Sequence, residues 1–286
     1  MANPTNQGYA TFKASASKTA YHLESAEMYI SKFEVESSTA TLVLATGVFT
    51  DATPQTFTVD ALISVVKKNF WVLDDNNKLC WALITDNDAS TITIAANMTT
   101  CTIIDTEVAG AFTDGETYTY CVLEAHDTSE LGNWMGYVNN VSFERTEEKI
   151  QHKNGVPRSL EREDLLEATG SATFDLLSTE RNLANAIYNA IQYGEETLYY
   201  KTGTGFNPGT KGFYEVVMVS DDINAKALIN RLLKVQLSPN GAVDKSSEEY
   251  KVIPTMVTCF SHSLVSAAVT TDAGGAVDMA WEWREK

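Results

Sequence analysis

Alternation of apolar and polar residues is the main feature of this sequence. Short runs rich in Thr, Val, Ile, Tyr and Phe are separated by clusters of Asn, Asp, Gly and Ser. Because successive side chains of a strand point to opposite faces, this pattern is typical of antiparallel sheet. Strands are predicted at residues 70–73, 79–84, 91–94, 117–123, 137–147, 170–177, 197–201, 212–219, 233–238 and 255–260. The protein is therefore expected to be mainly β.

The first four predicted strands form a group of their own. The first three are joined by short segments rich in Asp and Asn, which suit tight turns, and they are expected to form a three-stranded meander. Residues 35–125 also hold three lysines against twelve acidic residues, a net charge of −9. We predict that residues 35–125 are an inserted small β domain, closed as a barrel or a sandwich, and that residues 1–34 and 126–286 form the other domain.

One segment departs from the strand pattern because it is dense in charges of both signs. Residues 149–167 contain Gly155 and Pro157 and are expected to be either a long, exposed loop or an extended hairpin. Loops of this length without structure of their own are uncommon in compact domains and usually carry function. A merely solvated connection is the alternative.

A helix is predicted after the strand at residues 170–177. Apolar residues recur at spacings of three and four from Leu183 to Ile191. Ser178 or Thr179 can cap the start of this helix, and Gly194 can end it. One face of the helix is expected to lie on a sheet.

The composition excludes several classes of protein. The 286 residues contain 21 Lys and Arg against 38 Asp and Glu, a net charge of −17, so general attraction to nucleic-acid phosphates is not expected. No window approaches the roughly 18 consecutive apolar residues of a membrane helix. Residues 1–7 lack the basic and apolar stretches of a signal peptide. The chain is expected to be soluble, to have no membrane partner and to be made in the cytoplasm.

Motifs for catalysis and ligand binding are missing from the sequence. The four histidines are scattered without metal-binding spacing, and neither a nucleophile elbow nor a phosphate-binding loop is present. We therefore predict no enzyme activity, no metal and no cofactor. The four cysteines are far apart and are expected to be buried, reduced thiols in strands. Trp71, Trp81, Trp281 and Trp283 could form a platform for sugar stacking, with core or interface packing as the alternative.

From residue 131 onward the order of features is unusual. A strand that begins at a glycine-containing segment leads into the charged segment, and a second strand leads into the predicted helix. A strand with a Pro-Asn-Gly turn, an acidic turn and a last strand follow. The pieces lie at residues 131–144, in the charged segment to residue 167, and at residues 170–174, 180–187, 235–241 and 247–254. This order resembles the tail tube proteins, or major tail proteins, of tailed bacteriophages.

The resemblance implies a fold and an assembly. The implied fold is an antiparallel β-sandwich or barrel with one flanking helix, to which the small all-β domain is added, so that the class is mainly β (α+β). Six subunits would form a ring in which each adds strands to one inner barrel, and rings would stack into a tube for DNA ejection. The implied partners are other copies of the chain, the tape measure, terminator and baseplate proteins, and viral DNA that passes through the lumen without specific binding. The implied location is the tail of the virion.

The charged segment is then the expected site of contact between subunits and between rings. Its candidate residues are Lys149, His152, Lys153, Arg158, Glu161, Arg162, Glu163 and Asp164. Two alternative functions stay open: another structural protein of the virion, such as a tail terminator or a head decoration protein, and a carbohydrate-binding β module.

Overall fold

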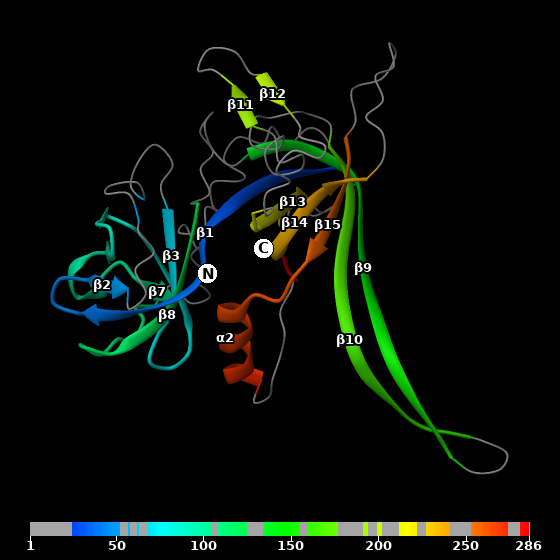
Figure 1. Ribbon diagram of the computed structural model, residues 1–286, viewed down its shortest axis with the longest axis horizontal. Coiled ribbons are helices and arrows are strands. Elements are labelled where there is room, and N and C mark those ends of the chain that lie inside the picture. Colours follow the sequence, from blue (N-terminus) through cyan, green and yellow to red (C-terminus); the bar gives the residue numbers. More distant parts are fainter. Residues whose placement is uncertain are drawn as a thin grey trace.

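Antiparallel strands make up most of the described molecule (Figure 1). The computed structural model describes residues 25–51, 57, 62, 68–103, 108–124, 134–154, 159–176, 191–193, 199–201, 212–221, 227–240, 253–273 and 281–285. This part of the chain contains one α-helix, α2 (Ser263–Ala273). The expected mainly β fold with one flanking helix is confirmed.

Six strands of the first sheet close into a barrel. They are the first part of β1 (Ser25–Val43), β9 (Trp134–Asn154), β10 (Ser159–Leu176), β13 (Tyr214–Asp221), β14 (Ala227–Pro239) and β15 (Ile253–Cys259). Their order is β13-β14-β15-β10-β9-β1, and β13 also pairs with β1, which completes the circle. Alternate side chains fill the interior, among them Met28, Val138 and Phe174, all at most 2% exposed. The interior is therefore a packed core.

Among the described strands, three short ones belong neither to this circle nor to the second sheet. The last strand, β16 (Trp281–Glu285), pairs with β14. A separate hairpin is formed by β11 (Ile191–Tyr193) and β12 (Tyr199–Lys201).

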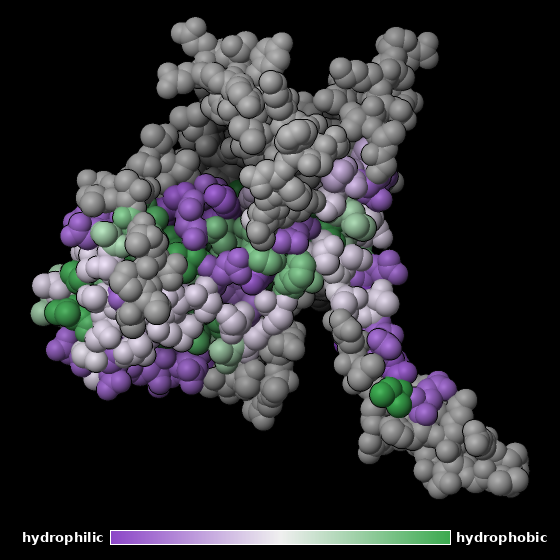
Figure 2. Space-filling view, in the orientation of Figure 1, coloured by the Kyte–Doolittle hydropathy of each residue, from purple (hydrophilic) through white to green (hydrophobic). Residues whose placement is uncertain are grey.

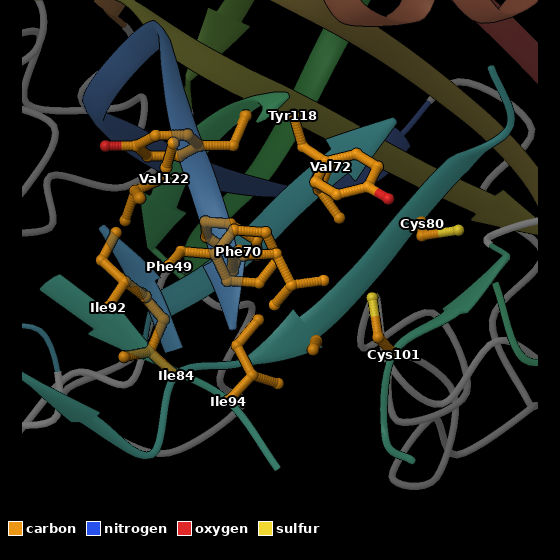
Figure 3. Close-up of a cluster of buried hydrophobic side chains, with 14 of the residues drawn as sticks. Phe49, Phe70, Val72, Cys80, Ile84, Ile92, Ile94, Cys101, Tyr118 and Val122 are labelled. Carbon is orange, nitrogen blue, oxygen red and sulfur yellow. The ribbon is translucent and has the colours of Figure 1, made fainter. Parts of the chain in front are cut away.

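A second sheet curls around another apolar core (Figure 3). It consists of the second part of β1 with β2 (Val48–Asp51), β3 (Lys68–Leu73), β4 (Leu79–Leu83), β5 (Asp86–Asn87), β6 (Thr91–Thr93), β7 (Thr102–Ile103) and β8 (Thr117–Glu124). The strand order is β5-β6-β2-β1-β8-β3-β4-β7. Phe49 and Phe70 pack with ring centroids 4.7 Å apart at its centre.

The predicted three-stranded meander is wrong, because its third strand, at residues 91–94, does not pair with the second. Strands β3 and β4 pair as expected, but β6 pairs with β2 and β5, and β7 takes the other edge of β4. The physical reason is local: the Asp88 N–H donates to the Thr91 carbonyl at 3.0 Å, which closes a tight turn between β5 and β6. That turn carries Ile92 into the core, where it is buried in the same apolar cluster as Phe49 of β2.

The two sheets share strand β1 and a third apolar cluster. The cluster contains Phe33 of β1 and, from the second sheet, Trp71 and Leu123. It also contains Leu233 of β14 and Leu264 of α2. The predicted boundary between residues 34 and 35 falls inside β1, which runs through both sheets without a break. That residues 35–125 fold as a separate domain stays a prediction.

A buried ion pair lies at the same junction. In β14, Leu232 points into the barrel, so its neighbour Arg231 points out of the barrel toward the second sheet. The Arg231 guanidinium donates to the Glu215 carboxylate of β13, and its carbon Cζ lies 4.4 Å from the centroid of the Trp71 ring. Burial, reinforced by the charge of Arg231, lowers the pKa of the neighbouring His262 to about 4, so this imidazole is neutral at pH 7.

Helix α2 was not predicted from the sequence. The helix that was predicted to end at Gly194 is wrong at its C-terminal end. Residues 191–193 form β11 and pair with β12, so no helix extends to Gly194; residues 177–190 lie outside the described part of the chain. Because α2 is rich in Val and Thr, which have low helix propensity, its sequence does not predict a helix. Its buried residues Leu264, Val265 and Ala268 hold it against the junction.

Candidate functional site: the β9–β10 arm

Strands β9 and β10 continue far beyond the barrel as a two-stranded arm. We define the arm as residues 145–154 of β9 and 159–169 of β10, which pair with each other. It projects away from both sheets (Figure 1). At about 3.4 Å per residue, ten residues of a strand span roughly 35 Å. Of the two structures left open for the charged segment, the extended hairpin is the one observed.

An irregular point in β9 precedes the arm, within the barrel part of the strand. Asn140 has a φ of 52°, and its side-chain amide donates to the Asp175 Oδ2 of β10 at 2.7 Å. The strand register shifts beside it, between Thr173 and Asp175, as in a β-bulge. Val141 packs against the barrel core immediately after this bulge. The bulge therefore lies where β9 is still packed on the barrel core.

The register of the arm brings the predicted contact residues together. The opposed pairs are Leu165 and Lys149, Asp164 and Ile150, Glu163 and Gln151, Arg162 and His152, and Leu160 and Lys153. Glu161 lies at the register shift between Leu160 and Arg162. Arg158 lies outside the described residues. The structure thus places seven of the eight candidates on one hairpin, and their role in contacts between subunits stays a prediction.

One face of the arm carries a row of alternating charges. The Glu147 carboxylate lies 3.0 Å from the Arg145 guanidinium and 3.0 Å from the Lys149 ammonium, each two residues away on the same strand. The hydrogen bond from Lys149 and then the two positive charges lower the pKa of Glu147. Because these groups are exposed to water, the row gives the face a charge pattern and little stability.

Two exposed apolar side chains also lie along β9. Ile150, far out on β9, is 46% exposed, and Phe143, just before the arm, is 37% exposed. In Figure 2 the coloured part of the arm stands clear of the two sheets and shows hydrophilic surface beside a small hydrophobic patch. Isolated two-stranded hairpins are marginally stable in water.

The outer edges of the arm offer backbone hydrogen bonds. Within the described chain, β9 has no partner strand other than β10 from residue 145 outward, and β10 has none other than β9 up to residue 169. Unpaired N–H and C=O groups along such edges are a template for a strand of another chain. The edges of the barrel are different, because β13 and β1 pair with each other. The sequence pattern alone does not distinguish these two kinds of edge.

Other candidate sites are accounted for by packing. Trp71 and Trp81 are 1% and 9% exposed, so these two cannot form a surface for sugar stacking. Trp281 and Trp283 lie in β16, and the structure does not describe their side chains. The cysteines are confirmed as buried and free, although Cys101 precedes β7 and is not in a strand.

The described residues contain no group of His, Cys, Asp and Glu side chains that could hold a metal ion. In the same part of the chain, no helix has the length and apolar character required to cross a membrane. Comparison with models of known protein families and with curated proteins finds no match.

Proposed function

We propose that this chain is the structural subunit of the tail tube of a tailed bacteriophage, which forms hexameric rings that stack around a channel for DNA. The observation that carries the proposal is the arm, whose outer edges have no partner strand in the described chain and which exposes Ile150, on a barrel whose own edges are paired. A closed barrel has no free edge for another subunit, so the arm is the element suited to join copies of the chain. The arm of one subunit packs on a neighbour in the same ring or in the next ring.

The charge of the chain suits a conduit for DNA. A net charge of −17 repels phosphates, so that DNA slides through a lumen formed by this protein and is not held there. In this proposal the protein resides in the tail of the virion. It contacts the tape measure, terminator and baseplate proteins, and it has no catalytic role.

Assembly of the purified full chain tests the proposal. We expect rings of six subunits, or tubes built from them, at high protein concentration in negatively stained electron micrographs. Sedimentation velocity should show a matching conversion of monomer to a discrete oligomer. A monomer at every concentration by both methods would contradict the proposal, and glycan binding by that monomer would favour a carbohydrate-binding module.

Reversal of one charge in the arm tests the predicted contact residues. Arg162→Glu is expected to raise the protein concentration needed for assembly on the order of tenfold, because a small unfavourable contact is repeated around each ring. Lys78→Glu, in a turn of the second sheet, changes the net charge equally and is the matched control. The concentration dependence of assembly is measured by light scattering. Equal effects of both variants would count against a specific contact by the arm.

A further inference from the structure

Two buried thiols face each other at the edge of the second sheet. Cys80 lies in β4, and Cys101 lies immediately before β7, the strand that pairs with β4. Both residues are completely buried in the same apolar cluster (Figure 3), and the Gly110 N–H, beside the Cys80 sulfur, donates to the Cys101 carbonyl. A hydrogen bond to Cys80, together with burial, raises the pKa of the Cys101 thiol. The two thiols therefore lie at neighbouring strands in one core, and the Cys101 thiol is protonated at pH 7.

The surroundings keep this pair in place. The Trp81 Nε1–H donates to the Thr102 Oγ1 at 3.0 Å, which fixes β7 on β4 beside the two cysteines. Gly110 covers the Cys80 sulfur so closely that a Cβ at this position would lie 2.6 Å from it. Any larger residue at position 110 would displace the sulfur. The other two cysteines, Cys121 and Cys259, lie in β8 and β15.

Access to the pair requires only a local opening. Strand β7 is the last named strand of the sheet and is held to β4 by two residue pairs, Cys80 with Ile103 and Trp81 with Thr102. On its other side, the Ile103 N–H donates to the Val108 carbonyl and the Gly110 N–H to the Cys101 carbonyl, so residues 108–110 must open with it. Short edge strands of this kind open without unfolding of the whole domain. An opened Cys101 is exposed to water, where its thiolate forms more readily than in the closed sheet.

We infer that Cys80 and Cys101 form a redox site, which closes to a disulfide by exchange with a small-molecule disulfide such as oxidised glutathione. The Cys101 thiol loses its proton, attacks the small disulfide and releases one small thiol. The Cys80 thiol loses its proton and attacks the mixed disulfide, which releases the second small thiol and leaves the Cys80–Cys101 bond. Two electrons pass from the protein to the small disulfide, and the two protons end on the two thiols that are released. The bond ties the edge strand to β4, so the sheet can no longer open there.

The experiment uses the purified full chain, kept either with dithiothreitol or with excess oxidised glutathione at pH 8. After removal of the reagents and denaturation, a thiol assay should count four free thiols in the first sample and two in the second. Peptide mapping by mass spectrometry should find one linkage, Cys80 to Cys101. The oxidised protein should melt about 5–10 °C higher than the reduced one.

Two variants separate this site from a general effect of oxidation. Cys101→Ala should keep all its remaining thiols and show no rise in melting temperature, whereas Cys121→Ala, which removes another buried thiol, should still form the linkage. Four free thiols in the oxidised wild-type chain, or a linkage that includes Cys121 or Cys259, would overturn the inference. A linkage between two chains on a non-reducing gel would overturn it as well. The thiol count and the peptide mapping on the wild-type chain test the inferred linkage even if a variant does not fold.

Discussion

Arg231→Met is expected to lower the free energy of unfolding by about 3–5 kcal/mol, because it leaves the Glu215 carboxylate buried without the guanidinium that neutralises it. The methionine keeps a long side chain over Trp71, so the loss measures charge more than volume. Unfolding in urea, followed by circular dichroism, gives this value. The slope of the transition should stay the same if the native fold is retained.

Two further variants define the origin of this effect. Arg145→Met removes an arginine that is 55% exposed on the arm, and it should unfold at nearly the same urea concentration as the wild-type chain. Arg231→Met combined with Glu215→Leu should recover much of the lost stability, because a well-packed apolar pair can replace a buried ion pair. If Arg231→Met and Arg145→Met were equally mild, the buried pair would have no special role at the junction.

Removal of the arm is expected to abolish assembly while the barrel stays folded. In the variant, residues 147–168 are replaced by Asn-Gly, a two-residue turn that joins the opposed residues Thr146 and Thr169. Among the side chains that the structure describes, none from the arm is a buried member of the three apolar clusters, so the melting temperature should change little. Without its exposed apolar surface and its unpaired edges, the subunit should sediment as a monomer at concentrations at which the full chain assembles.

A milder variant is the control for this truncation. Ile150→Ser keeps the arm and its register but removes an apolar side chain that is 46% exposed on it, so it should weaken assembly without abolishing it. Thr146→Ser, also on β9, should assemble like the wild-type chain. Rings or tubes from the truncated chain would show that subunits join through another surface.

The alternation of residues predicts where strands lie better than which strands pair. Period-two alternation records which side chains share a face, and so strands β3, β4, β8, β13 and β15 were all found near their predicted positions. The alternation does not indicate which strands pair with each other. Strand β4 pairs with β7 and not with β6, because the turn at Asp88 and the burial of Ile92 determine which strands β6 pairs with. Helix α2 was missed because packing of Leu264 and Val265 outweighs a weak local preference.

The site was predicted in part, for a similar reason. The density of charge between residues 149 and 167 marked the segment, but the register shifts after Leu160 and Leu165 interrupt the alternation on β10 and leave a loop equally compatible with the sequence. The exposure of Ile150 was not predictable, because an apolar residue within a strand is usually buried. The ion pair of Arg231 and Glu215 gave no sequence signal either, since the two residues meet only when β13 and β14 pair.

Strand β1 leaves no linker between the two sheets. It pairs with β13 over residues 27–32 and with β8 from residue 33 onward, so consecutive residues belong to different sheets. A hinge motion there would have to break ladder hydrogen bonds and separate the apolar cluster around Trp71. The second sheet is consequently carried at one fixed orientation by the barrel. In averaged micrographs of any assembly of this chain, it would appear as sharp density repeated at the spacing of the subunits, without the blurring of a tethered module.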